Sequence, residues 1–208
     1  MSRKTIFYVV FFTVLVLGFY VALTRTIPDF GTVKLPVLSY VQPFSFTNQD
    51  GRTVTEADIK GKVYVTEYFF TTCGSICPIM NTNMRDIYEA YKHEDGFRIL
   101  SHTCDPDVDN PQRLKQYADS LQVNTDRWWF LTGRKDSLYN MARNSYLLDD
   151  PNNNLQSIEE QFLHTQFFAL VDKNGRVRKI YDGLKKDELK LLKEHIATLL
   201  EEPVVAKK

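Results

Sequence analysis

The longest apolar stretch of the chain lies close to its N-terminus. Residues 6–23 contain no formally charged side chain. As a helix rising about 1.5 Å per residue, this stretch would be about 27 Å long, close to the hydrocarbon thickness of a bilayer. It is longer than the apolar region of a typical signal peptide, and no small-residue cleavage site follows it. The pattern predicts an uncleaved membrane anchor, with a cleaved signal peptide as the alternative.

The charges beside this stretch predict its orientation. Arg3, Lys4 and the amino terminus precede it, whereas only Arg25 follows closely. Positive side chains favour the cytoplasmic side of a membrane. No Arg- and Ser-rich transit sequence precedes the apolar residues. We therefore expect a bacterial inner-membrane protein that crosses the membrane once through residues 6–23 and has its C-terminal domain in the periplasm.

After residue 40, strand patterns and helix patterns alternate. Short strands flank a turn at residues 48–51, and an Asn-Gly turn near residue 174 predicts a hairpin. The order of strand, helix, strand and helix, followed by a hairpin and a last helix, is typical of an α/β thioredoxin-like fold. Strands are expected at 44–46, 62–70, 97–100, 128–131, 166–171 and 176–181, helices from Pro78, from Pro111, at 137–146 and at 184–200, and a polar loop at 149–160.

Length and composition fit this plan. The 208 residues allow one domain and a short appendage, so we expect an anchor at 1–24, a linker at 25–40 and a thioredoxin-like domain at 41–204. Lys and Arg total 26, as do Asp and Glu, and this balance argues against a nucleic-acid partner. Three cysteines are too few for a disulfide-rich scaffold.

Cys73 and Cys77 lie four residues apart where the predicted strand gives way to a helix. The positive end of a helix dipole lowers the pKa of a nearby thiol, so both are candidates for a catalytic redox pair. The three-residue spacer also leaves room for both sulfurs to converge on a metal ion. Two buried apolar cysteines, or a structural disulfide, are the alternatives.

His164 precedes the predicted hairpin and follows the polar loop. Two thiolates and one imidazole form a donor set that copper accepts, Cu(I) through the sulfurs and Cu(II) with help from the nitrogen. Cys73, Cys77 and His164 are therefore candidate metal ligands. This hypothesis requires the His164 loop to fold back over the thiols.

Three motifs together resemble the Sco/SenC family. They are the CxxxCP core within residues 69–84, the DPDVD run at 105–109, and LHTQFFALVDKNGRV at 163–177. The family consists of membrane-anchored, thioredoxin-fold copper chaperones for cytochrome c oxidase assembly. The resemblance implies that Cys73, Cys77 and His164 correspond to the copper ligands and that Asp105 and Asp109 match an acidic motif beside the metal loop.

Two residues depart from the family pattern. Cys104 stands where an aliphatic residue is more common, and His102 is also unusual; both are predicted on one face of a strand end. We expect Cys104 to be a buried small hydrophobe, with a third reactive thiol as the alternative. His93 and His195 are expected to be solvated surface residues, and Met80 and Met84 to belong to the core.

Three functions remain open at this stage. The leading hypothesis is a copper chaperone with an oxidase subunit and a thiol reductase as partners, because only the reduced thiol pair binds metal and the periplasm is oxidising. The second is a thiol-disulfide oxidoreductase that uses Cys73 and Cys77 without His164. The third, a peroxiredoxin-type peroxidase, is disfavoured because Phe70 and Gly74 stand where that family places a threonine.

Overall fold

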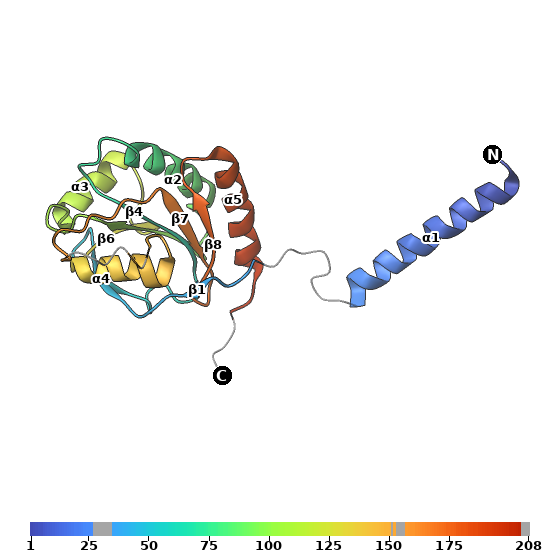
Figure 1. The fold of residues 1–208 in the computed structure, drawn as a ribbon, viewed down its shortest axis with the longest axis horizontal. Coiled ribbons are helices and arrows are strands. Elements are labelled where there is room, and N and C mark those ends of the chain that lie inside the picture. Colours follow the sequence, from blue (N-terminus) through green and yellow to red (C-terminus); the bar gives the residue numbers. More distant parts are fainter. Residues whose placement is uncertain (27–34, 151, 153–156, 205–208) are drawn as a thin grey trace. The chain divides into compact units, whose positions relative to one another are not determined.

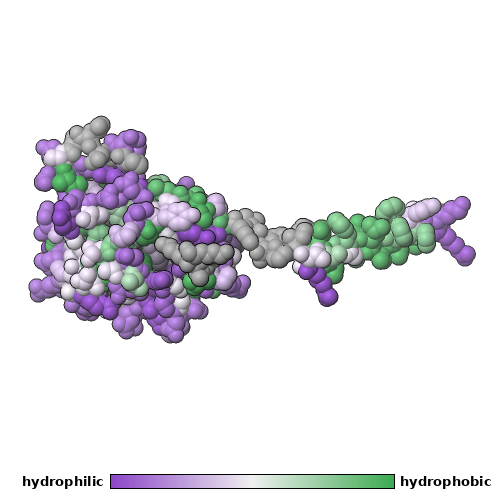
Figure 2. All heavy atoms as spheres, turned by 90° about the horizontal axis from the view of Figure 1, so that it is seen from below, coloured by the Kyte–Doolittle hydropathy of each residue, from purple (hydrophilic) through white to green (hydrophobic). Residues whose placement is uncertain are grey.

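The computed structural model describes residues 1–26, 35–150, 152 and 157–204. The chain divides into two compact units, Met1–Leu35 and Pro36–Lys208. Helix α1 (Arg3–Thr26) dominates the first unit, and no residue of it is buried. In the described part of the chain it is the one helix long and apolar enough to cross a membrane. Figure 2 shows its apolar surface, which contrasts with the largely hydrophilic surface of the second unit.

The second unit is built on an eight-stranded sheet with the order β1-β8-β7-β4-β5-β6-β2-β3. Strands β4, β5 and β6 are parallel, and their neighbours pair antiparallel. β4 is central and wholly buried, as its run of β-branched and aromatic residues predicts. The strands are β1 (Ser39–Tyr40), β2 (Ser45–Asn48), β3 (Thr53–Thr55), β4 (Val63–Phe69), β5 (Phe97–Thr103), β6 (Trp128–Thr132), β7 (Phe167–Val171) and β8 (Arg176–Asp182).

Helices cover both faces of this sheet (Figure 1). α2 (Cys77–Tyr91), α3 (Pro111–Leu121) and α5 (Lys186–Glu201) lie on one face. α4 (Lys135–Asn140) and the π-helix η1 (Met141–Tyr146) lie on the other, where Tyr64 and Tyr68 of β4 join their core cluster. The structure therefore has the predicted α/β layers.

The amphipathic patterns explain how the helices pack. Met80, Met84 and Ile87 of α2 are spaced by four and three residues and are all fully buried, so the prediction of core methionines is confirmed. α3 begins as expected, because the Asn110 side chain accepts a hydrogen bond from the Arg113 N–H at 3.0 Å.

Three elements differ from the expectations. β5 continues to Thr103 instead of ending at Leu100, the helix expected at 137–146 is a short α-helix followed by a π-helix, and β1 lies within the segment expected to be a linker. β1 pairs with β8 through Ser39 and Tyr40, so the sheet extends beyond the expected start of the domain. Residues 27–34 of the expected linker, and parts of the polar loop at 149–160, lie outside the described residues.

Candidate functional site

The cysteine pair lies where the central strand passes into the first helix of the globular unit. β4 ends at Phe69, and Cys77 is the first residue of α2. The Cys73 N–H donates to the Phe70 carbonyl at 3.1 Å, which folds the connecting segment into a turn. Cys73 is partly exposed and Cys77 is 4% exposed, and both are free thiols. One sulfur can thus be reached from solvent while the other lies behind it.

The two thiols have different acidities. Burial opposes ionisation of Cys73, but hydrogen bonds from the Cys77 thiol and from the backbone N–H groups of Ser75 and Cys77 outweigh it, so the Cys73 pKa is lowered. Burial, followed by the bond to Cys73, raises the Cys77 pKa to about 12. The expectation of two lowered thiol pKa values therefore holds for Cys73 and is wrong for Cys77.

A buried carboxylate fixes the cysteine segment from the side of β5. Asp109 is fully buried, accepts hydrogen bonds from the Thr71 N–H at 3.1 Å and from the Thr71 hydroxyl, and accepts one from the Thr103 hydroxyl at 2.6 Å. Arg113 Nε donates to Thr71 Oγ1 at 2.7 Å and lies 3.8 Å from the Asp109 carboxylate. The acidic motif thus meets the cysteine segment through Thr71.

His164 lies on an exposed loop beside the same segment. Its ring centroid is 4.8 Å from that of Phe162 and 6.4 Å from that of Phe70, and the two phenylalanine rings are 5.0 Å apart. Phe70 is also the residue whose carbonyl accepts the Cys73 N–H. Among the residues that the structure describes, no three Cys, His, Asp or Glu side chains are grouped closely enough to hold a metal ion. The structure brings Cys73 and Cys77 together and places His164 against Phe70 and Phe162, outside a closed ligand set.

His102 and Cys104 belong to the core on the face of α4 and η1. Cys104 is 2% exposed, and burial raises its pKa well above the usual value, in agreement with the expected small hydrophobe. The His102 ring stacks on Tyr68 with centroids 5.1 Å apart, and its Nδ1 lies 3.1 Å from Thr66 Oγ1. Burial lowers the His102 pKa to about 3, so this imidazole is neutral at physiological pH.

The other two histidines lie far from this core. His93 is exposed in the turn after α2, as expected apart from its helical placement. His195 is half-buried, and its Nδ1 lies 2.7 Å from the Tyr181 hydroxyl, so the expectation of a solvated residue is wrong. The reason is that β8 presents Tyr181 to the inner side of α5.

Glu67 is a buried acid that the sequence analysis did not single out. It accepts a hydrogen bond from Ser101 Oγ at 2.7 Å, and Trp128 Nε1 donates to the same hydroxyl at 2.8 Å. Its second oxygen has no hydrogen-bond partner within the described chain. Burial raises its pKa to about 7. A glutamate within an otherwise uncharged, β-branched and aromatic strand was the available signal.

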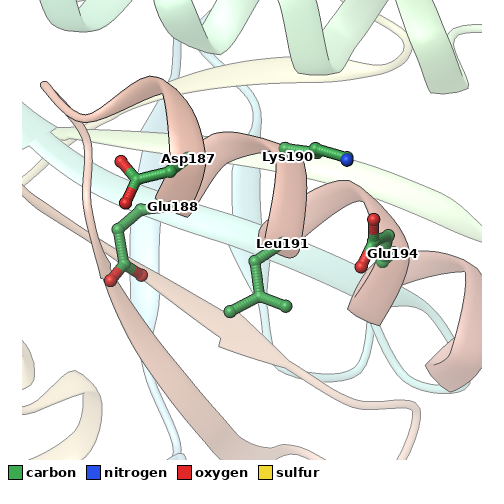
Figure 3. Close-up of a pocket in the computed structure, with 5 residues that line it drawn as sticks. All are labelled: Asp187, Glu188, Lys190, Leu191 and Glu194. Carbon is green, nitrogen blue, oxygen red and sulfur yellow. The ribbon is translucent and has the colours of Figure 1, made fainter.

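Two surface hollows lie away from the cysteines. One is formed by a single face of α5, with Asp187, Glu188, Lys190, Leu191 and Glu194 as its lining (Figure 3). The other is lined by residues of the β2–β3 turn and by Arg98, Thr125, Asp126 and Trp129. Neither hollow is lined by a cysteine or by His164, so the thiol pair does not belong to these hollows.

The sheet order, with a cysteine pair between a central strand and the following helix, defines a thioredoxin-like protein. The family model SCO1/SenC matches residues 34–201, and the chain belongs to this family. It is 36% identical over 157 residues to the SCO1 protein homolog of Bacillus subtilis, covering 74% of this chain and 79% of that protein.

Solved structures agree with this assignment. The structure of BsSco, described as a member of the Sco family of cytochrome c oxidase assembly proteins with a disulfide switch, matches with a TM-score of 0.67 and 32% identity, over 81% of this chain and 97% of that one. ScoI of Bradyrhizobium japonicum, solved with copper bound, shares the fold with a TM-score of 0.61 at 21% identity, over 78% of this chain and 100% of that one.

Proposed function

We propose that this protein is a membrane-anchored copper chaperone for cytochrome c oxidase assembly, with Cys73, Cys77 and His164 as the copper ligands. The observation that carries the proposal is the placement of two free thiols at an accessible strand-to-helix turn, with an exposed imidazole packed beside that turn. Soft sulfur donors suit Cu(I), and an added nitrogen suits Cu(II). Membership of a family with copper-bound structures supports the same cargo.

Copper loading on this site requires two changes. Both cysteines must lose their protons, because the thiolate is the ligand, and the high pKa of Cys77 makes its deprotonation depend on the metal. The His164 loop must also move towards the sulfurs to complete the set. A disulfide between the cysteines would abolish the site, so a thiol reductase is the expected second partner beside the oxidase subunit.

Copper titration of the reduced full-length protein in detergent tests the proposal. We expect one copper ion per chain, loss of tight binding in Cys73→Ser and Cys77→Ser, and weaker Cu(II) binding in His164→Ala. Cys104→Ser and His93→Ala are matched controls, because they remove a thiol and an exposed imidazole outside the proposed set. Unchanged stoichiometry in both cysteine variants would overturn the assignment.

The unequal thiols favour a second candidate, a thiol-disulfide oxidoreductase. An accessible thiol of lowered pKa beside a buried thiol of raised pKa suits attack on a substrate disulfide by Cys73, followed by resolution through Cys77. His164→Ala separates the two functions in a strain that carries only this protein, at limiting copper. Loss of oxidase activity supports copper carriage, whereas near wild-type activity supports the oxidoreductase.

A further inference from the structure

Four residues from three segments form one hydrogen-bonded group beside the cysteines. Thr71 lies in the turn after β4, Thr103 is the last residue of β5, Asp109 lies just before α3, and Arg113 lies in the first turn of α3. We call this group the Thr71 clasp. Thr71 is two residues from Cys73, and 38 residues separate it from Asp109. The clasp is thus a long-range contact that ends beside the proposed ligands.

The Thr71 hydroxyl is the centre of the clasp. It donates to the Asp109 carboxylate and accepts from Arg113 Nε at 2.7 Å, so the guanidinium and the carboxylate are linked through one hydroxyl. Asp109 is fully buried, and a buried carboxylate is costly unless its oxygens are hydrogen-bonded. Because the buried Asp109 carboxylate needs hydrogen-bond donors, its bonds to Thr71 hold that residue in one position.

This constraint extends to Cys73. Thr71 follows Phe70, and the Phe70 carbonyl accepts the Cys73 N–H at 3.1 Å. The Cys77 side chain in turn lies close enough to the Cys73 thiol to contribute to the lowered pKa of Cys73. A fixed Thr71 thus keeps the turn from Phe70 to Cys73 in place and keeps one sulfur close to the other.

We propose that Asp109 and Arg113 are positioning residues that act through Thr71 to set the equilibrium between the Cys73–Cys77 dithiol and its disulfide. The inference rests on the proposed function of the pair. Two thiols held together have a high effective concentration for each other, so the clasp favours closure of the disulfide. Asp105, the first aspartate of the DPDVD run, lacks this role, since its carboxylate accepts no hydrogen bond from any described residue.

Equilibration with glutathione measures this effect without copper. The dithiol passes two electrons and two protons to glutathione disulfide, whose S–S bond breaks as the Cys73–Cys77 bond forms and two glutathione thiols are released. For Asp109→Asn, Thr71→Val and Arg113→Met we expect the constant for disulfide formation to fall about tenfold, which raises the reduction potential by about 30 mV. Asp105→Asn is the matched control and should leave the constant unchanged.

Coupling between variants separates positioning from a general loss of structure. Because Arg113 acts through the Thr71 hydroxyl, the Thr71→Val/Arg113→Met double variant should lower the constant no further than the larger single change. Thr71→Val is nearly isosteric on a partly exposed segment, so it remains usable if Asp109→Asn does not fold. Constants within about threefold of wild type for Thr71→Val and Arg113→Met, or additive effects in the double variant, would overturn the proposal even if copper binding through the cysteines is established.

Discussion

At the scale of single residues, the two cysteines differ in how deeply their side chains are buried. Cys73 lies in the turn with part of its side chain in solvent, whereas Cys77 lies in the first turn of α2 against the core. The N-terminal end of α2 offers a positive dipole to both, but the burial of Cys77 outweighs it. Cys73 is therefore the nucleophile of the pair, and Cys77 is shielded from solvent.

This asymmetry predicts selective alkylation. When the reduced full-length protein is treated with iodoacetamide near pH 7.5, Cys73 should react at least about tenfold faster than Cys77, because the thiolate is the reactive form and only Cys73 is accessible. Peptide mass spectrometry over time measures both rates. Cys104→Ser serves as a control that removes the remaining thiol, and equal rates at Cys73 and Cys77 would contradict the assignment.

Glu67 predicts a pH dependence of stability. Burial raises its folded-state pKa to about 7 from 4.5, so the folded protein binds the proton more tightly than the unfolded chain does. The contribution of Glu67 to the unfolding free energy is then fully present below pH 4.5 and is lost as pH rises to about 7, by about 3 kcal/mol in total. Glu67→Gln should remove most of this fall.

Urea unfolding of the full-length protein in detergent at pH 5 and pH 8 measures the effect. Tryptophan fluorescence reports on the globular unit alone, because both tryptophans of the chain lie in β6. We expect wild type to lose more stability than Glu67→Gln between the two pH values. An equal loss in both proteins would show that the Glu67 proton is not involved.

Some site residues were predictable from the sequence and others were not. The spacing of Cys73 and Cys77 at a strand-to-helix boundary was visible, as was the acidic motif that contains Asp109. The partner of Asp109 was not visible, because nothing in the local pattern at Thr71 indicates a contact 38 residues away. The environment of His164 could not be predicted for the same reason, since its ring packs near two phenylalanine rings, Phe70 and Phe162, from separate segments.

At the scale of elements, prediction succeeded where apolar periodicity was strong and failed where polar residues were buried. The strand expected at 97–100 continues through Ser101, His102 and Thr103, which are polar yet fully buried. Each finds a partner inside the fold: Glu67 for Ser101, Thr66 for His102 and Asp109 for Thr103. Such compensation is a property of the assembled sheet and cannot be read from one strand.

An ion cluster predicts how the last helix is held. Arg178 of β8 has a side chain that is 5% exposed, and its Nη1 lies 2.8 Å from Asp172 and 2.7 Å from Glu202, just beyond the end of α5. Arg178→Met would leave the Asp172 carboxylate, which is 1% exposed, with Arg176 as its remaining ion-pair partner in the described cluster. We expect a loss of about 3 kcal/mol, because breaking a buried pair leaves a charge poorly compensated.

The same fluorescence-detected urea unfolding measures this change. Arg134→Met is the matched control, because the Arg134 side chain is 82% exposed and its pair with Asp136 should contribute little to stability. A loss in Arg178→Met no larger than that in Arg134→Met would show that the cluster does not hold α5 to the hairpin.

At the scale of the whole molecule, one helix suited to a bilayer precedes one globular unit that carries all three cysteines. Nine residues, 27–35, separate the end of α1 from Pro36, and a chain of that length reaches about 30 Å when fully extended. If α1 is retained in the membrane, these nine residues tether the globular unit to it.

The last prediction concerns the orientation of that anchor. Because Arg3 and Lys4 precede the apolar segment and only Arg25 follows closely, the globular unit should lie across the membrane from the cytoplasm. Alkaline phosphatase fused after residue 208 should be active in a bacterial host, since this enzyme forms its disulfides only in an oxidising compartment. The fusion should remain in the membrane fraction at its full mass, whereas a cleaved signal peptide would give a shorter, released product. An inactive phosphatase, together with an active cytoplasmic reporter at the same position, would contradict the predicted orientation. The thiol pair would then lie in the cytoplasm, where no oxidising environment makes a dedicated reductase necessary.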